Sequence, residues 1–367
     1  MSPSVERFET GGGGRIYRLP LEVFPGFWGY AHYVAAGGMR ALVDVGSGFG
    51  ESNNQLAAGL AQVAADYGEA ADWSDLTHVL ISHGHIDHFG GLPYVMQLTD
   101  APAYVHELDL RTLTRYEERL AIVGHRLREY LIEAGLSSER QEELIDLYLL
   151  NKQLFRSVDV RHIYPNGAPV GPLEVIHVPG HCPGQVVFLL HDVMLTGDHV
   201  LPVTSPHQAP ERLTLSTGVG HYLSSLKKLA SLAARVRLGL GGHEGPITNL
   251  AARLDELNEV HRQRMRRLLD EMTEPHTIGE LSQALFPHAG GYHALLAIEE
   301  TGAHIEYLEQ RGFVGLDNAH DLEVEERCAL RYVRLAERPI EALDGGETIT
   351  EIIAATQSKG GTVDVQL

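Results

Sequence analysis

The chain contains the sequence His83-Gly84-His85-Ile86-Asp87-His88, one residue after the apolar, β-branched run Thr77-His78-Val79-Leu80-Ile81. Such a run predicts a buried strand, and the glycine lets the backbone turn where the strand ends. Alternation along an extended segment predicts that His83, His85 and Asp87 point to one side, with His88 beside them. Residues 83–88 therefore predict two groups of metal ligands that aim at two nearby points.

Three further ligand-type side chains follow apolar stretches or lie beside glycine. They occur in the segments Val178-Pro179-Gly180-His181, Thr196-Gly197-Asp198 and Gly241-Gly242-His243. With the first segment they give seven side chains that coordinate through nitrogen or a carboxylate oxygen, and none that coordinates through a thiolate. This set suits borderline divalent metals such as zinc, with iron and manganese as alternatives. The sequence therefore predicts a site for two divalent metal ions.

These segments resemble the metallo-β-lactamase superfamily, whose H-x-H-x-D-H signature residues 83–88 match in full. The resemblance extends over about residues 15 to 250. It implies three ligands for each metal and a seventh that bridges them: His83, His85 and His181 for one metal, Asp87, His88 and His243 for the other, and Asp198 as the bridge.

The same resemblance assigns roles beyond metal ligation. Asp44, in the strand-like segment Leu42-Val43-Asp44-Val45-Gly46, is expected to support the ligands. Asp87 is expected to act in catalysis as well, by orienting a metal-bridging hydroxide or by moving its proton. His199 and His207, which follow Asp198, are candidate substrate contacts.

The resemblance also implies an α/β fold, namely a four-layer αββα sandwich over residues 1–250. The amino-terminal part has strand-like segments near residues 16–19 and 31–34 and a helical, alanine-rich segment over 55–67. Another helix is expected over 89–98, directly after the first ligand segment. This alternation of strands and helices is typical of such a fold.

A helical insertion is expected over about residues 107–157. Residues 107–155 contain no proline, and charged and apolar residues recur there at helical spacing. Gly135 marks a break, with Ser137 or Ser138 as the cap of a second helix. Two interpretations stay open: a solvated helical hairpin, or a lid over the substrate whose pocket is walled by Tyr116, Tyr130, Tyr148 and Phe155.

The carboxy-terminal part is predicted to be a winged-helix-like domain over residues 251–340. Helices are expected over 250–272, 277–286 and 293–311, the second with Thr277 and Glu280 as a capping box, followed by a strand near 329–333. This arrangement resembles the carboxy-terminal module of lactamase-β-like endoribonucleases. No role is assigned to the tail, residues 341–367.

Charge argues against a nucleic-acid partner. The chain has a formal net charge of −20, and residues 250–340 contain 10 Lys and Arg against 17 Asp and Glu. Phosphate binding requires a concentrated basic face. The third helix carries Glu299, Glu300, Glu306 and Glu309, and the one local basic cluster, Arg262, Arg264, Arg266 and Arg267, spreads around its helix. A role in packing or oligomerisation is therefore favoured, and a homo-oligomer is left open.

The length of 367 residues suits two domains, and the hydrophobic content of 44% is that of a globular enzyme. The two cysteines, Cys182 and Cys328, are too few for a disulfide framework. No signal peptide is recognised at the amino terminus, and no segment reaches the roughly 20 apolar residues of a membrane helix. A cytoplasmic location and no membrane partner are expected.

Three functions remain compatible with this sequence. The first is hydrolysis of a small carboxylic ester, thioester or lactone by a metal-bridging hydroxide, since two cations that share a water lower its pKa. The second is metal-dependent cleavage of RNA. The third is a non-hydrolytic reaction, such as that of a persulfide dioxygenase with one iron at His83, His181 and Asp198.

Overall fold

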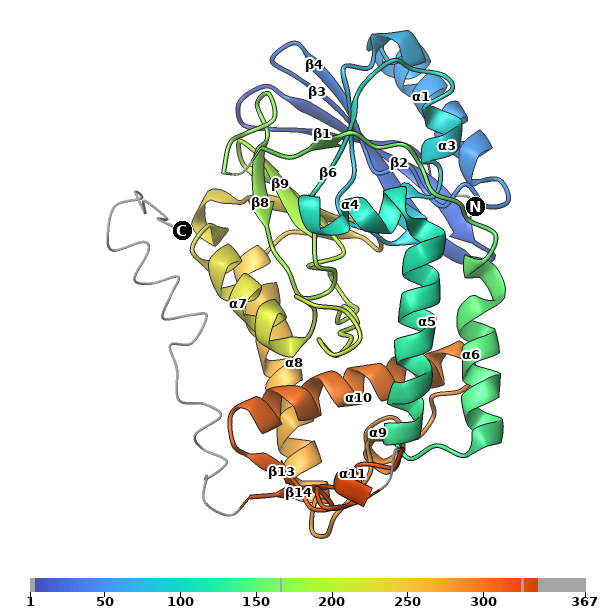
Figure 1. Ribbon diagram of the computed structural model, residues 1–367. Helices are drawn as coiled ribbons and strands as arrows, with labels where there is room; N and C mark the ends of the chain where they lie inside the picture. The colour runs from blue at the N-terminus through green and yellow to red at the C-terminus, as the bar shows by residue number, and fades with distance from the viewer. Residues whose placement is uncertain (1–3, 166, 325–326, 336–367) are drawn as a thin grey trace. The chain divides into compact units, whose positions relative to one another are not determined.

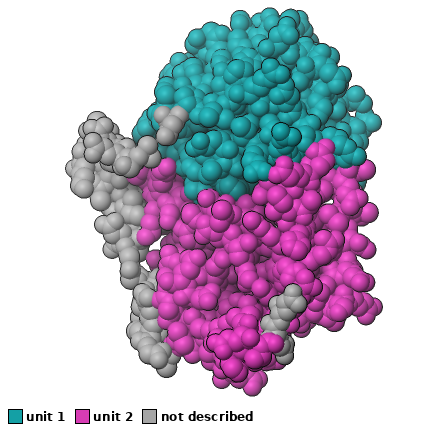
Figure 2. All heavy atoms as spheres, viewed as in Figure 1, with its two compact units in different colours: residues 1–116, 155–206, 232–253 teal, residues 117–154, 207–231, 254–367 magenta. Residues whose placement is uncertain are grey.

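The protein is described by a computed structural model that covers residues 4–165, 167–324 and 327–335 (Figure 1). The described residues form two compact units (Figure 2): unit 1 comprises those within 1–116, 155–206 and 232–253, and unit 2 comprises those within 117–154, 207–231 and 254–335. The units are thus interleaved along the chain. The contiguous division predicted from the sequence, with boundaries at 250 and 340, stays a prediction, and the tail 341–367 lies outside the described residues.

Unit 1 contains two β-sheets and short helices. The strands of the larger sheet follow the chain order β1 to β7: β1 Glu6–Glu9, β2 Arg15–Phe24, β3 Phe27–Ala36, β4 Met39–Val43, β5 His78–Leu80, β6 Ala103–Val105 and β7 His162–Ile163. The smaller sheet has the order β12-β11-β10-β9-β8, with β8 Glu174–His177, β9 Val186–Leu190, β10 Val193–Gly197, β11 Leu238–Gly241 and β12 Pro246–Ile247. The helices are α1 Ser52–Tyr67, α2 Ile86–Phe89, α3 Leu92–Val95 and α4 Glu107–Thr114, with single 3₁₀ turns at Trp73–Asp75 and Ala233–Arg235.

The direction of the strands places several strand ends together. In the larger sheet β4, β5, β6 and β7 are parallel, and in the smaller sheet β10 and β11 are parallel. Parallel neighbours end at the same edge of a sheet. Residues that follow β10 and β11 therefore share one edge, as the sequence requires for Asp198 and His243.

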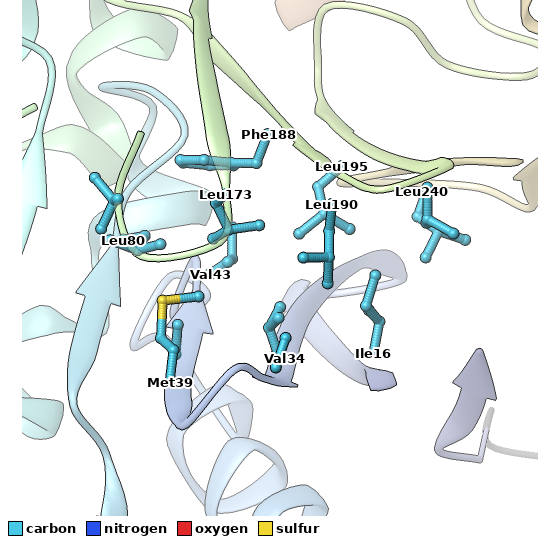
Figure 3. Close-up of a cluster of buried hydrophobic side chains, with 14 of the residues drawn as sticks. Ile16, Val34, Met39, Val43, Leu80, Leu173, Phe188, Leu190, Leu195 and Leu240 are labelled. Carbon is cyan, nitrogen blue, oxygen red and sulfur yellow. The ribbon is translucent and has the colours of Figure 1, made fainter. Parts of the chain in front are cut away.

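The core of unit 1 lies between the two sheets (Figure 3). Both sheets contribute aliphatic side chains from alternating positions, for example Ile16 and Val34 from the larger sheet and Leu190 and Leu240 from the smaller one. The strands β9 and β10 are buried at every position, which explains why apolar residues follow one another in their sequences without alternation. Helix α1 buries Leu56, Leu60 and Val63 at helical spacing and approaches β2 closely, since a Cβ at Gly59 would lie 3.3 Å from Leu19.

Unit 2 is largely helical. Its helices are α5 Tyr116–Glu133, α6 Ser138–Lys152, α7 Val219–Ala230, α8 Leu250–Glu271, α9 Ile278–Leu285, α10 Tyr292–Gln310 and α11 Asp321–Val324, and its hairpin pairs β13 Val314–Leu316 with β14 Tyr332–Arg334. The predicted break near Gly135 is present between α5 and α6. A second break at Arg115, between α4 and α5, was not predicted.

One residue proposed as a lid wall belongs to the interior of unit 2. Tyr130 is buried, and its hydroxyl donates to the carbonyl of Ile298 at 2.9 Å. Gly302 makes this contact between α5 and α10 feasible, because a Cβ there would overlap the Tyr130 ring. The Tyr130 ring thus packs α5 against α10, and its role as a pocket wall stays a prediction.

The carboxy-terminal order of three helices and a two-stranded hairpin agrees with the sequence. The capping box is confirmed: the Glu280 amide donates to Thr277 Oγ1 at 3.2 Å, and the Thr277 amide donates to Glu280 Oε2 at 2.8 Å. The winged-helix assignment itself stays a prediction. The loop before α9 also bonds to the insertion, because the Gly279 amide donates to the Ala134 carbonyl at 2.8 Å.

Two acidic residues of α10, Glu300 and Glu306, serve packing. Glu300 is buried, and its carboxylate accepts the Gln208 amide at 2.7 Å and the Arg264 guanidinium at 2.8 Å. Glu306 accepts the Glu211 amide at 2.6 Å. These side chains bind the segment that begins at residue 207 to α10, so they do not act as charge on a free helix face.

A buried cluster of His261, Glu300 and His304 has the composition of a metal site. Its polar atoms already bond to one another. His304 donates from Nδ1 to the Glu300 carbonyl at 2.7 Å, so Nε2 is its acceptor, which faces His261 Nδ1 at 3.0 Å. Because the Glu300 carboxylate bonds to Arg264 and Gln208, we describe the cluster as a buried hydrogen-bond network that joins α8 to α10.

We expect the stability of the protein to fall as the pH rises through 7. Burial raises the pKa of Glu299 to about 7, with Lys152 partly opposing the shift, and His207 Nε2 lies 3.4 Å from the carboxylate. The folded chain thus binds a proton between about pH 4.5 and 7 that the unfolded chain releases, so stability falls by up to about 3 kcal/mol as the pH rises across that window and levels off above it. Urea unfolding at pH 5 and pH 8 should show the loss, and Glu299→Gln should reduce it. An unchanged pH dependence in Glu299→Gln, matching that of the exposed control Glu323→Gln, would contradict the assignment.

Candidate metal centre

The predicted ligands all lie in unit 1, at or just after the ends of strands. His83 and His85 lie in the loop after β5, and Asp87 and His88 lie in α2. His181 lies in the turn between β8 and β9, Asp198 directly follows β10, and His243 is the second residue after β11. Hydrogen bonds hold these ends together, since the Gly242 amide donates to the Gly197 carbonyl at 2.8 Å.

The structure brings the seven side chains together in two groups. The first group is His83, His85 and His181, and the second is Asp87, His88, Asp198 and His243. In the first group, His83 Nε2 lies 3.1 Å from His85 Nδ1. In the second, His243 Nε2 lies 3.2 Å from both Asp87 Oδ2 and Asp198 Oδ2. The groups adjoin, with 4.1 Å between the ring centroids of His83 and His88.

This grouping is the one that the family resemblance implies, but strand alternation does not produce it. The extended backbone ends at His85, and Asp87 and His88 belong to the short helix α2. Helical geometry therefore turns Asp87 away from His83 and His85 and toward the second group. The prediction that His83, His85 and Asp87 share one side of an extended segment is wrong for Asp87.

Hydrogen bonds orient the imidazoles of the second group. Asp44 Oδ2 accepts from His88 Nδ1 at 2.9 Å, and the Trp28 carbonyl accepts from His243 Nδ1 at 2.8 Å. With Nδ1 donating in both rings, Nε2 is the atom that faces the carboxylates and that a metal ion would bind in place of a proton. Partners of this kind fix the tautomer and the ring orientation of metal-binding histidines. Asp44 is thus placed as predicted, in contact with a candidate ligand.

Asp44 also contacts the first ligand loop. Its Oδ1 accepts the Ser82 amide at 2.7 Å, and its Oδ2 accepts the Ser82 hydroxyl at 2.7 Å. Ser82 Oγ lies 3.0 Å from His83 Nδ1. The backbone of Asp44 has a φ of 58°, in the left-handed region that Asp tolerates better than most residues. Sequence reasoning missed Ser82, although its position directly before His83 was a usable signal.

The charges of the site favour a cation. Burial lowers the pKa of His83 and of His85 well below the usual range, so both imidazoles are neutral donors of a lone pair. Burial also opposes charge on His243, yet Asp198 and Asp87 raise the pKa of this imidazole to about 10. The second group therefore attracts positive charge, which a divalent ion would supply in place of a proton.

Two further observations fit a metal ion at this place. The buried Oδ1 of Asp198 has no hydrogen-bond partner among the described residues, and buried polar atoms without partners are uncommon. Gly242 leaves open the space beside it, because a Cβ at that position would lie 2.4 Å from Asp198 Oδ1 and 2.5 Å from His88 Cε1. The donor set, five imidazoles and two carboxylates, is one that zinc accepts.

The two candidate substrate contacts are placed differently. His199 is fully buried, and burial, together with His181 and His177, lowers its pKa to about 3. His207 lies in unit 2, with Nε2 3.2 Å from the Leu296 carbonyl. Contact of either residue with a substrate stays a prediction.

An aromatic side chain that sequence reasoning did not select stacks on the site. Phe27, at the start of β3, is 48% exposed, and its ring lies 4.6 Å from the His243 ring at an angle of 29°. Gly29 permits this approach of β3, since a Cβ there would lie 3.2 Å from His243. No local motif marks Phe27, because its position depends on how β3 meets the end of β11.

Substitution of Asp44 by Asn is expected to weaken metal binding about 10- to 100-fold with little change of fold. The amide keeps the volume but can accept at only one atom, so either His88 or Ser82 loses its partner. Calorimetric titration of the metal-free protein with zinc would measure the effect. Affinity equal to that of the parent protein would contradict the orienting role.

Comparisons with known proteins agree with this geometry. Residues 29–243 match the model of the metallo-beta-lactamase superfamily. The lactamase-like protein nscB of Trichophyton rubrum is 25% identical over 251 residues, which is 68% of this chain and 59% of that protein. An atrochrysone carboxyl ACP thioesterase of Aspergillus terreus is 28% identical over 238 residues, which is 64% of this chain and 55% of that protein. The chain therefore spans less than two thirds of the length of these curated relatives.

Solved structures show the same fold. A metallo-beta-lactamase family protein from Thermus thermophilus aligns with a TM-score of 0.69 and 27% identity, over 87% of this chain and 98% of that protein. A beta-lactamase domain protein from Burkholderia ambifaria aligns with the same TM-score at 20% identity, over 90% of this chain and 94% of that protein. The predicted α/β sandwich is confirmed by these neighbours. With the family match over more than half of the chain, and the seven motif residues gathered at one edge of the sheets, this chain belongs to the metallo-beta-lactamase superfamily.

Proposed function

We propose that the protein is a metal-dependent hydrolase with two divalent ions, most suitably zinc, and that it acts on a small carboxylic thioester, ester or lactone. The observation that carries the proposal is the pair of adjoining ligand groups. Three imidazoles form one group, and two imidazoles with two carboxylates form the other. Such a pair matches the two-metal sites of hydrolases.

Divalent ions bound at the two groups would lower the pKa of a shared water and polarise a carbonyl oxygen. The chain's own residues have distinct parts in this reaction. Asp198, next to His88 and His243, would hold the ion of the second group and, by the family resemblance, would also contact the ion of the first. Asp87, whose Oδ2 also lies beside His243 Nε2, would orient the attacking water and take its proton. Asp44 and the Trp28 carbonyl keep the two imidazoles aimed at that point.

The substrate class rests on two observations. One relative is named as a thioesterase that acts on an acyl carrier protein, and it matches 64% of this chain. The exposed ring of Phe27 beside His243 offers an apolar surface to an acyl group, which suits a carbonyl substrate. Extension from that relative to this chain is part of the proposal.

The alternatives gain no comparable support. The basic side chains of α8 bond internally, with Arg264 on Glu300, Arg266 on Glu259 and Arg267 on the Ala284 carbonyl. They therefore do not form the concentrated basic face that RNA requires. A one-iron dioxygenase at His83, His181 and Asp198 would leave Asp87, His88 and His243 without a function, although they lie together.

No helix among the described residues is long and apolar enough to cross a membrane.

The test is a metal count followed by a substrate panel on one preparation. We expect about two zinc ions per chain and metal-dependent hydrolysis of acyl thioesters, including acyl carrier protein conjugates, or of lactones. The same preparation is tested with structured RNA over a salt series. One iron per chain with persulfide turnover, or salt-sensitive RNA cleavage faster than that of every carbonyl substrate and absent in His83→Ala, would overturn the proposal.

A further inference from the structure

A buried carboxylate connects the two loops that carry the first ligand group. Asp109, in α4, is only 1% exposed. Its Oδ2 accepts the Gly84 amide at 2.8 Å, and its Oδ1 accepts the Gly184 amide at 2.9 Å. Gly84 lies between His83 and His85, and Gly184 is the third residue after His181. One side chain thus bonds to the backbone of both loops.

Both loops carry glycine where they meet this carboxylate. A Cβ at Gly184 would lie 2.6 Å from Asp109 Cγ, closer than real Cβ contacts occur, and a Cβ at Gly84 would lie 3.2 Å from the same atom. Any other residue at 184 would therefore displace the loop or the carboxylate. The absence of side chains at these two positions allows the backbone amides to reach Asp109.

The position of Asp109 matters because the first group is assembled from separate parts of the chain. His83 and His85 follow β5, whereas His181 lies almost 100 residues later, between β8 and β9. A metal site tolerates only small changes in ligand separation.

We propose that Asp109 is a positioning residue for the first metal: it sets the separation of the His83 and His85 loop from the His181 loop, and thereby the affinity of that group alone. This inference rests on the proposed two-metal function. The second group is oriented by Asp44, which also bonds to Ser82 in the first ligand loop, and by the Trp28 carbonyl, so its orientation does not depend on the amides of Gly84 and Gly184. Loss of the Asp109 contacts should therefore affect the two metals unequally.

The experiment uses Asp109→Asn in two backgrounds that each retain one ligand group. His243→Ala weakens the second group and leaves the first, whereas His181→Ala does the reverse. Asp109→Asn keeps the side-chain volume, but its amide accepts at one atom only, so one loop loses its bond. Zinc or cobalt titration of metal-free protein measures affinity without reference to activity. Asp192→Asn is the matched control, since Asp192 also accepts a distant amide, that of Gly11 at 2.7 Å, outside the ligand loops.

We expect Asp109→Asn to lower the affinity about 10- to 100-fold in the His243→Ala background and to leave it unchanged in the His181→Ala background. Gly184→Ala, which disturbs the same contact from the other side, should have the same selective effect and serves if Asp109→Asn does not fold. Equal losses in both backgrounds, or none, would overturn the positioning role while a parent protein with two metals keeps the proposed function. A parent protein that binds no metal would overturn both.

Discussion

Replacement of Asp198 by Ala is expected to lower the metal content of the protein and its kcat/KM by at least about 100-fold. Asp198 Oδ2 lies 3.3 Å from His88 Nε2 and 3.2 Å from His243 Nε2. The substitution leaves these imidazoles with Asp87 as the one remaining carboxylate of the second group. Two cations would then be held with less compensating charge, so binding weakens before any step of the reaction.

Metal analysis after dialysis would measure the metal content, and turnover of the best thioester substrate would measure kcat/KM. The matched control is Asp66→Ala, which removes an exposed carboxylate from α1 and should change neither quantity. Circular dichroism would establish that both variants fold. Full metal content with unchanged turnover in Asp198→Ala would refute the assignment of two metals to this site.

Replacement of Phe188 by Ala is expected to lower the free energy of unfolding by about 3 to 5 kcal/mol. Phe188 lies on β9, is fully buried between the two sheets and packs edge to face on Tyr164, with 5.7 Å between ring centroids (Figure 3). Its removal leaves a cavity between sheets whose strands cannot close the gap without disturbing the ladder of β9 with β8 and β10. Such a loss is a large part of the stability of an ordinary domain.

Urea unfolding followed by fluorescence would measure the change. Val203→Ala, which shortens a side chain of unit 1 that is 78% exposed, is the control and should alter stability by less than about 0.5 kcal/mol. If the two substitutions had similar effects, the inter-sheet core would not be the main source of stability in unit 1. Metal binding by Phe188→Ala under folding conditions should be nearly normal, because Phe188 contacts none of the seven ligands in the described contacts.

The local signals in the sequence were sufficient for much of the fold. Helices expected over 250–272 and 293–311 correspond to α8 and α10 within one residue at each end. The capping box at Thr277 was correct to the atom pairs. These features depend on residues within one turn of each other, and so the sequence shows them directly. The seven candidate ligands were recognisable for the same reason, because each belongs to a short segment at a strand end.

Other features depend on which segments far apart in the chain come into contact, and short-range sequence patterns do not indicate such contacts. The four glutamates of the third helix suggested packing or oligomerisation without indicating a partner, and the structure shows Glu300 and Glu306 bound to amides of residues 208 and 211, almost 100 residues earlier. The helical insertion was predicted over about residues 107–157 as part of the amino-terminal domain, whereas residues 117–154 pack in one unit with the carboxy-terminal helices. A buried carboxylate and an exposed one have the same sequence signature, since only the burial and the partner differ.

The metal centre likewise has some features that follow from local sequence and others that depend on contacts between distant segments. The sequence by itself determined which seven side chains could bind metal, because ligand chemistry and spacing are properties of the segments. Only the tertiary structure decided which carboxylates support them: Asp44 was suggested by resemblance, whereas Asp109 is one of 49 acidic residues and has no motif. Asp109 matters because it accepts two amides, those of Gly84 and Gly184, that lie 100 residues apart in the chain. These amides come together only when the chain folds, because β5 and β8 belong to separate sheets.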